Sequence, residues 1–281
     1  MKKPNLGGKA AEIAYYDRGP TPFFACAYDQ RFSYCLYAPE LPKGQDKYRL
    51  IVLVHGTDRP AERNRDGFRA FARAHGALIM APLFPANISG PGDLSGYKRI
   101  RHDGIEYDTV LLSMIDEVRA RYPVQDKCIM QGFSGGAHYT HRFLMAHPQQ
   151  LAGASIGAPG IVTLVDDRHD WLIGTRDFAE IFGNAPDLDA IAKVPVQIAV
   201  GDQDTATWEI TMRPGDGWWE PGAEWQQDAT RIVRAQTLRD NLESLGCDVD
   251  FTLVPGVGHE TEAFWPPAQK WMASLFDKGL A

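Results

Sequence analysis

Ser134 stands in a glycine-rich stretch that directly follows an apolar run, reading C-I-M-Q-G-F-S-G-G over residues 128–136. A strand, then G-x-S-x-G, then a helix forms the sharp turn called a nucleophile elbow, which exposes the serine Oγ above the edge of a sheet. In so tight a turn, side chains at Gly132 and Gly136 would collide with the neighbouring strand and helix, which explains both glycines. The pattern predicts a nucleophilic serine; the alternative is a strand–helix turn that merely contains Gly and Ser.

The serine hydroxyl needs a base to accept its proton, and an acid to orient that base. Among the histidines after Ser134, only His259 follows a terminal strand in a loop, V-P-G-V-G-H-E. His138, His141 and His147 fall on or at the end of the helix after the turn, so we expect them to be packing or surface residues. We therefore predict His259 as the base.

The acid is expected in the loop after the strand at 194–200, which reads G-D-Q-D-T and offers Asp202 and Asp204. In a chain with this order of elements the acid stands between the serine and the histidine. We favour Asp204. Whichever aspartate is not the acid should be a solvated loop carboxylate.

A tetrahedral oxyanion needs two preorganised N–H donors. The first is expected to be the amide of Gly135, directly after the nucleophile, and the second the amide of Thr57 in the loop H-G-T-D that follows a buried strand. Gly56 lets that loop turn close to the site. We expect His55 to anchor the loop through hydrogen bonds rather than to transfer protons.

These residues depend on an alternation of strands and helices. Strands are expected at 50–54, 77–82, 127–131, 151–158, 194–200 and 250–255, and helices at 63–75, 106–121, 136–147, 228–245 and 265–277. The segments F-F-A-C-A-Y and F-S-Y-C-L-Y-A-P flank Asp29-Gln30 and predict an N-terminal β-hairpin. Short unbroken apolar runs such as L-I-V-L-V are typical of strands buried on both faces. The sequence therefore predicts an α/β fold: a mostly parallel central sheet with an N-terminal antiparallel hairpin and helices on both faces.

Two segments, about 161–190 and 205–227, interrupt the alternation and are expected to form a cap-like insert on a single domain spanning residues 1–281. Residues 161–228 hold fourteen acidic residues against four basic ones. The insert predicts either a pocket for an aromatic or cationic group or a solvated acidic surface with packed tryptophans. The candidate pocket residues are Trp171, Trp208, Trp218, Trp219 and His169. The basic stretch Y-K-R-I-R-H at 97–102 could meet a carboxylate, although a solvated loop is the simpler interpretation.

The bulk composition excludes several classes of protein. A formal net charge of −7 argues against a nucleic-acid-binding protein, and no apolar run reaches the length of a membrane span. The opening M-K-K-P-N-L-G-G-K-A lacks the apolar core of a signal peptide, so we expect a cytoplasmic protein. The four cysteines have no metal-binding spacing and are expected to be reduced. No metal or organic cofactor is implied, and the sequence does not indicate an oligomeric state.

The order L-V-H-G, G-F-S-G-G, V-G-D-Q-D, P-G-V-G-H resembles the α/β-hydrolase superfamily across essentially the whole chain. Within that superfamily, residues 107–159 look most like polyhydroxybutyrate depolymerases, feruloyl esterases and dienelactone hydrolases. The resemblance implies the α/β-hydrolase fold and a cofactor-free serine hydrolase. The larger Trp-rich insert and the absence of a signal peptide depart from secreted polyester depolymerases, which argues against a polymeric substrate.

The function expected first is a serine hydrolase that cleaves a carboxylic ester, or a related small acyl compound, through an acyl-enzyme. A peptidase or amidase, a cofactorless acyltransferase and a C–C-bond hydrolase could use the same three side chains. A different class is a non-catalytic binding protein that keeps the fold. The presence of Ser, Asp and His in the required order argues against that class.

Overall fold

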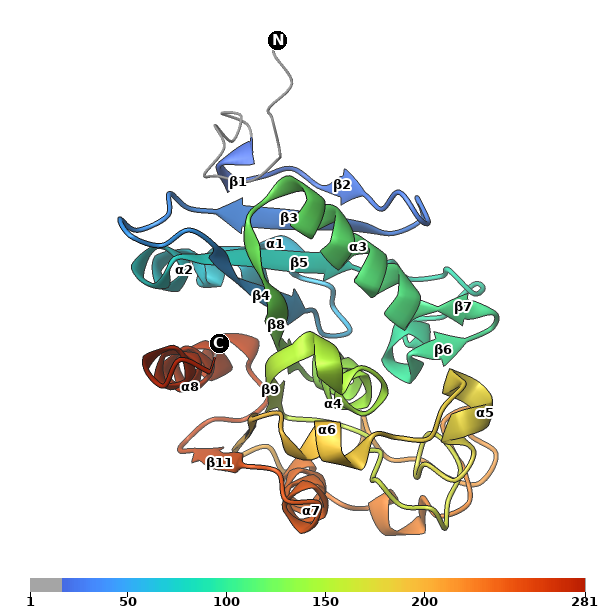
Figure 1. Ribbon diagram of the computed structural model, residues 1–281. Helices are drawn as coiled ribbons and strands as arrows, with labels where there is room; N and C mark the ends of the chain where they lie inside the picture. Colours follow the sequence, from blue (N-terminus) through green and yellow to red (C-terminus); the bar gives the residue numbers. More distant parts are fainter. Residues whose placement is uncertain (1–16, 281) are drawn as a thin grey trace.

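The computed structural model describes residues 17–280 and shows a large central sheet with helices on both faces (Figure 1). The strands of this sheet are β1 (Gly19–Pro20), β2 (Phe24–Ala25), β3 (Ser33–Ala38), β4 (Tyr48–Val54), β5 (Ala77–Leu83), β8 (Val124–Phe133), β9 (Leu151–Gly157), β10 (Val196–Gly201) and β11 (Val249–Val254). The helices are α1 (Ala61–Gly67), α2 (Arg69–His75), α3 (Tyr107–Arg121), α4 (Gly135–Ala146), α5 (Phe178–Phe182), α6 (Leu188–Ala192), α7 (Arg231–Ser244) and α8 (Trp265–Asp277). A separate short ladder joins β6 (Arg101–His102) to β7 (Ile105–Glu106).

The strand order is β1-β3-β5-β4-β8-β9-β10-β11, with β2 also paired to β3. Strand β3 runs antiparallel to β1, β2 and β5, whereas the pairs from β5 to β11 are parallel. The predicted mostly parallel sheet and the antiparallel hairpin are therefore confirmed. Because the parallel strands all end at one edge, the loops that follow β4, β8, β10 and β11 share that edge.

Residues 50–54 of β4 are apolar without a break because both faces of the strand are covered there. Its alternate residues enter two different cores: Leu50 and Val52 face the side of α3, α4 and α7, while Ile51 and Leu53 face α2 and α8. Successive side chains of a strand point to opposite faces, so a strand covered on both faces needs apolar residues throughout.

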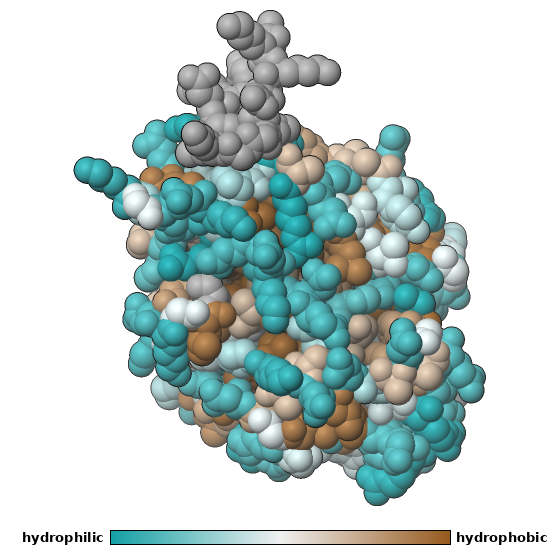
Figure 2. All heavy atoms as spheres, in the orientation of Figure 1, coloured by the Kyte–Doolittle hydropathy of each residue, from teal (hydrophilic) through white to brown (hydrophobic). Residues whose placement is uncertain are grey.

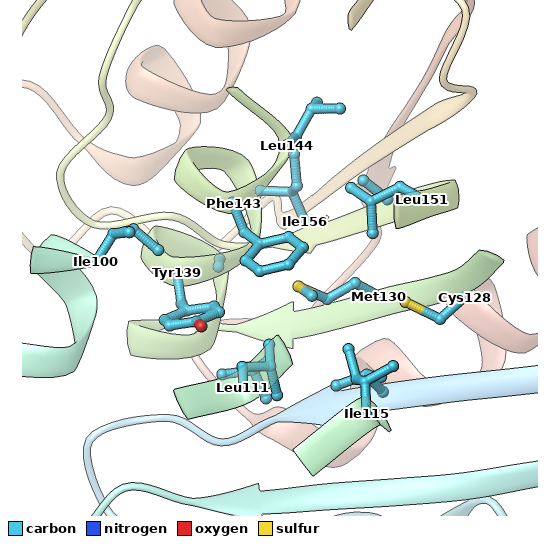
Figure 3. Packing of buried hydrophobic residues seen from close by; sticks show 14 of the residues in the cluster. Ile100, Leu111, Ile115, Cys128, Met130, Tyr139, Phe143, Leu144, Leu151 and Ile156 are labelled. Carbon is cyan, nitrogen blue, oxygen red and sulfur yellow. The ribbon is translucent and has the colours of Figure 1, made fainter. Parts of the chain in front are cut away.

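Figure 3 shows the first of these cores where α3 and α4 meet β8 and β9. Leu111 and Ile115 of α3 lie one turn apart, as do Tyr139 and Phe143 of α4, and both pairs surround Met130 of β8. Each of these five side chains is fully buried, and such burial stabilises the fold by about 1.5–3 kcal/mol per large apolar side chain. This packing fixes α4 against β8 and so holds the turn that carries Ser134.

The helix expected over 63–75 is two helices, because the chain breaks at Phe68. The Phe68 N–H donates to the Arg65 carbonyl, three residues back, and Phe68 has φ −101° and ψ 3°. The break follows Gly67, where an added Cβ would lie 2.4 Å from the indole ring of Trp265. The close contact with α8, which the helical pattern does not reveal, accompanies the break.

The surface view in Figure 2 shows a mainly hydrophilic face on which apolar residues form small, separated patches. Among residues 17–280, none of the helices combines the length and apolar character that crossing a membrane requires. The four cysteines are free and buried, as expected for reduced thiols. The opening ten residues, on which the expectation of a cytoplasmic protein partly depends, lie outside the described residues.

Candidate active site

The turn between β8 and α4 holds Ser134 in a conformation that residues other than glycine rarely adopt. Ser134 has φ 54° and ψ −115°, and its N–H donates to the Gly157 carbonyl of β9 at 2.8 Å. A Cβ at Gly132 would lie 2.1 Å from the carbonyl oxygen of Gly136, and a Cβ at Gly136 would lie 2.1 Å from that of Val54. The steric explanation of the two glycines is therefore confirmed.

Gly132→Ala is expected to destabilise the protein by about 3 kcal/mol or more, because the obstructing atom is backbone and cannot swing aside. Gly90→Ala is the matched control, since an added Cβ there meets no atom within 4 Å, and we expect a change within about 0.5 kcal/mol. Urea unfolding followed by circular dichroism measures both. Equal stability of the two variants would contradict the steric argument.

Three side chains from three loops meet above this turn. His259 Nε2 lies 3.0 Å from Ser134 Oγ, and His259 Nδ1 lies 2.7 Å from Asp204 Oδ2. These residues follow β11, β8 and β10, so the carboxyl edge of the sheet brings them together. Because the Asp204 carboxylate can accept a hydrogen bond from Nδ1–H, Nε2 is left to accept the serine proton. The arrangement can therefore activate Ser134 as a nucleophile.

The two candidate acids occupy different places. Asp204 is buried against His259, whereas Asp202 is half-buried and its Oδ1 accepts the Gly256 N–H at 2.8 Å. Asp202 thus caps the turn that leads into the histidine loop. The structure brings Asp204, and not Asp202, into contact with the histidine.

Sequence reasoning missed Arg231, which binds the second oxygen of Asp204. Arg231 is 2% exposed, and its guanidinium donates to Asp204 Oδ1 at 3.1 Å and to Glu209 Oε2 at 2.7 Å. With one carboxylate oxygen held by Arg231 and the other by His259, the Asp204 side chain has little freedom to rotate. Arg231 is therefore a positioning residue for the acid. Its place at the start of a helix distant in sequence gave no signal for this contact.

The histidine loop crosses directly over the end of β10. A Cβ at Gly201 would lie 2.2 Å from the Val257 carbonyl oxygen, so only glycine allows this approach. The His259 ring packs on the Phe133 ring with centroids 4.7 Å apart. These two contacts set the height and the orientation of the imidazole above Ser134.

The two predicted oxyanion donors lie side by side. A Cβ built on Gly135 would be 3.3 Å from the Thr57 nitrogen, and no hydrogen bond within residues 17–280 engages either amide. Two side chains fix the backbone of the Thr57 loop. The Arg59 guanidinium donates to the Thr57 carbonyl, and the Tyr97 hydroxyl donates to the His55 carbonyl. Two free N–H groups are thus available to an oxygen bound next to Ser134.

His55 anchors this loop, as expected. Its Nδ1 lies 2.8 Å from the Gly56 carbonyl, and its Nε2 lies 3.0 Å from the Phe84 N–H. Nδ1 therefore carries the proton and Nε2 accepts. Burial lowers the pKa of His55 to about 3, so the ring stays neutral and cannot act as a proton donor at ordinary pH.

A pocket of about 240 Å³ opens beside Ser134. Its lining comprises Thr57, Ser95, Lys98, Ser134, Gly135, His138, Gly160, Ile161, Glu209, Ile210, Thr211, Met212, Asp216, Trp218 and Arg231. Both inserted segments contribute to the lining of the pocket. The first, 161–190, supplies Ile161, and the second, 205–227, supplies residues between Glu209 and Trp218. The Arg99 guanidinium lies 4.1 Å from the centroid of the Trp218 ring, so a cation of the protein itself already covers this aromatic face.

The other four residues proposed for the pocket do not line it. Trp171 is buried against α5, and Trp208 is 81% exposed. Trp219 packs on a small apolar cluster inside the insert, and His169 lies against Gly222, where an added Cβ would be 2.3 Å from its ring. Aromatic density locates an insert in the sequence, but it does not reveal which side chains face the sheet edge.

The interpretation of residues 97–102 as a solvated loop is wrong. Tyr97, Lys98 and Ile100 are all buried, and Lys98 enters the pocket lining. The apolar Tyr97 and Ile100, interleaved with the cations, were the available signal of burial.

The segment 160–163 forms part of the pocket wall, and side chains of α4 satisfy its backbone. His138 Nε2 accepts the N–H groups of residues 160 and 161, and His141 Nε2 accepts that of residue 163, each at 3.0 Å. The Arg142 guanidinium donates to the Ile161 carbonyl at 3.4 Å. The three side chains are packed inside, as expected for the two histidines, but His138 also lines the pocket, which the sequence did not suggest.

Two further side chains bind the same segment from the second insert and from α7. Gln226 pairs with both backbone groups of Val162, accepting from the N–H at 3.0 Å and donating to the carbonyl at 2.9 Å. Arg234 donates to the Gly160 carbonyl and, at 3.0 Å, to the Ile210 carbonyl. The wall of the pocket is thus attached to both inserts and to two helices of the body.

Neither a protein-family model nor a curated protein sequence matches the chain. Solved structures do match it. The chain is similar to poly(aspartic acid) hydrolase-1 from Sphingomonas sp. KT-1, with TM-score 0.68 and 20% identity over 85% of this chain and 92% of that one. It is also similar to LpqC, a poly(3-hydroxybutyrate) depolymerase from Bordetella parapertussis, with TM-score 0.65 and 25% identity over 88% and 84%. A fluorophosphonate-binding serine hydrolase, FphF from Staphylococcus aureus, matches with TM-score 0.55 and 14% identity over 85% and 91%.

Proposed function

From the α/β-hydrolase fold that these neighbours share with the chain, we propose that the protein is a serine hydrolase that cleaves a carboxylic ester of a small acid. The observation that carries the proposal is the hydrogen-bonded chain from Ser134 Oγ through His259 to Asp204. The adjacent free amides of Gly135 and Thr57 support it, because acyl transfer needs an oxyanion site at that point.

In the acylation step, Ser134 Oγ attacks the ester carbonyl carbon while His259 Nε2 takes the hydroxyl proton. The carbonyl electrons move to oxygen, and the amides of Gly135 and Thr57 hold the resulting oxyanion. Asp204 stabilises the imidazolium through Nδ1–H. The tetrahedral intermediate then collapses, the C–O bond to the alcohol breaks, and His259 returns its proton to the leaving alcohol.

In the second step, water replaces the alcohol. His259 removes a proton from the water, the oxygen attacks the acyl carbon, and collapse releases the acid and returns the proton to Ser134 Oγ. The side chains of the site supply every proton transfer. A location in the cytoplasm, which is a reducing compartment, is part of the proposal. The four free thiols support it.

An amidase or peptidase is the second candidate. One solved neighbour is named as a hydrolase of a polymer of an amino acid, and another as a depolymerase of a polyester. These names refer to amide-linked and ester-linked polymers respectively. A binding protein without activity is less well supported, because the serine, histidine and aspartate are not only present but hydrogen-bonded in series.

A panel of chromogenic acyl esters and aminoacyl anilides tests the proposal. We expect turnover of short-chain esters with far slower release from the anilides, together with covalent labelling by a fluorophosphonate. Faster turnover of anilides would select the amidase. Absence of both turnover and labelling would refute the serine-hydrolase proposal and favour a binding protein.

A further inference from the structure

Lys98 brings a buried ammonium group to the wall of the pocket. It belongs to the turn η2 (Gly96–Arg99), is 8% exposed, and lines the same pocket as Ser134. Its backbone is fixed, because its carbonyl accepts a hydrogen bond from the buried Arg142 guanidinium at 2.6 Å. A Cβ built on Gly135 would lie 2.8 Å from Lys98 Cε. The lysine stem therefore passes directly beside one of the two oxyanion donors.

Within residues 17–280, no carboxylate forms an ion pair with Lys98. Its Nζ donates to the Ser95 hydroxyl at 3.0 Å, which is a neutral partner. A charge that is removed from water without a counter-ion is costly, so an anionic group bound in the pocket would stabilise this ammonium.

The carboxylates of the pocket do not fill this role. Glu209 is bound to Arg231 at 2.7 Å, and Asp216 accepts the Arg213 N–H at 2.6 Å. Both carboxylates are also exposed at the rim, where water screens their charge. The buried charge of the pocket that lacks an ionic partner is thus the positive charge of Lys98.

We propose that Lys98 and Ser95 form a subsite for a carboxylate on the substrate, so that the preferred substrates are esters of short acids carrying a second carboxylate near the scissile carbonyl. The inference rests on the proposed function and deepens it. The contact of Lys98 with Gly135 places the anion a few atoms from the reacting carbon, and a pocket of about 240 Å³ suits a short acyl chain. The same geometry disfavours a cationic substrate, which would meet Lys98 inside and Arg99 over Trp218.

The charge state of Lys98 sets the pH range of this preference. Burial lowers the pKa of Lys98 to about 8, with Arg59 and Arg142 acting in the same direction and Glu209 and Asp93 opposing it. The ammonium is therefore present below about pH 8 and is lost above it. The ratio of kcat/KM for an anionic ester to kcat/KM for a neutral ester should be highest near neutral pH. It should fall as the pH rises through about 8, because the ammonium group of Lys98 is lost there.

The test compares monoethyl succinate with its neutral isostere, the ethyl ester in which an isopropyl group replaces the carboxylate. The quantity measured is kcat/KM for monoethyl succinate divided by kcat/KM for the neutral ester, at about pH 7. Lys98→Met keeps an apolar stem of similar length and should lower this ratio by about tenfold to a hundredfold. Lys98→Arg keeps the charge and should restore most of the ratio. Lys43→Met is the control, because Lys43 is exposed in the loop before β4, at the opposite edge of the sheet.

An unchanged ratio would overturn the proposal. If both kcat/KM values fall by the same factor, Lys98 assists the oxyanion instead. A separate measurement keeps this proposal distinct from the hydrolase assignment: calorimetric titration of succinate into Ser134→Ala, with and without Lys98→Met. Succinate binding that requires Lys98, without turnover of any ester, would refute only the hydrolase. Ester turnover without succinate binding would refute only the carboxylate subsite.

Discussion

Ser134→Ala is expected to lose about 10⁶-fold in kcat on every ester that the unmodified protein cleaves. The reason is that, in the part of the chain that the structure describes, the hydroxyl bonded to His259 Nε2 is that of Ser134, at 3.0 Å. The amides of Gly135 and Thr57 remain in the variant, so a residual rate above the uncatalysed reaction is expected. The measurements are steady-state kinetics on the ester panel and fluorophosphonate labelling followed by mass spectrometry.

Ser244→Ala is the control for labelling, because Ser244 ends α7 on the surface and its hydroxyl donates to the Asn241 carbonyl of the same helix, away from any histidine bond within residues 17–280. That variant should be labelled and should turn over esters like the unmodified protein. Labelling that persists in Ser134→Ala, at any residue, would place the nucleophile elsewhere. A circular dichroism melt establishes that the comparison is made on folded protein.

Asp204→Asn should lower kcat by about 10⁴-fold with the fold retained. The amide can donate its own hydrogens to Nδ1, which favours the tautomer in which Nε2 carries the proton and cannot accept another. The exchange also leaves Arg231 with Glu209 as its remaining carboxylate partner, so some loss of thermal stability is expected besides the loss of rate.

Asp202→Asn is a close control because it makes the same chemical change two residues away. An asparagine oxygen can still accept the Gly256 N–H, so kcat should stay within a few-fold of the unmodified protein. The reverse pattern, with Asp202→Asn severe and Asp204→Asn mild, would assign the acid to Asp202 despite the hydrogen bond between Asp204 and His259.

The fold and the central residues of the site could be predicted because their signals are local. Residues 50–54 of β4 and 77–83 of β5 form unbroken apolar runs, and the turn at Ser134 needs glycines at 132 and 136 for a steric reason that holds wherever the turn occurs. The loops with Asp204 and His259 follow strands that end at the same edge, so their meeting follows from the topology alone.

The pocket could not be predicted in the same way, because its side chains come from loops whose direction no periodic pattern sets. In the sequence, Lys98 is separated from Ser134 by the β6–β7 ladder, α3 and β8. The neighbouring Tyr97 and Ile100 indicate that this segment is buried, but they do not indicate that Lys98 faces the pocket. Arg231 begins a helix and reaches Asp204 across the second insert. Trp208 and Trp218 lie ten residues apart in the same Trp-rich segment, yet the indole of Trp208 is solvated and that of Trp218 lines the pocket.

The segment 160–163 has a consequence for the kinetics of opening. Its backbone groups are bonded to His138, His141 and Arg142 of α4, to Arg234 of α7 and to Gln226, rather than to a strand or helix of its own. Lifting this wall would leave several buried donors and acceptors without partners at once, so the wall opens only when the body of the protein opens. Amide hydrogens at 160, 161 and 163 are therefore expected to exchange with deuterium as slowly as those of β8, and this side of the pocket is expected to keep its shape when a substrate enters.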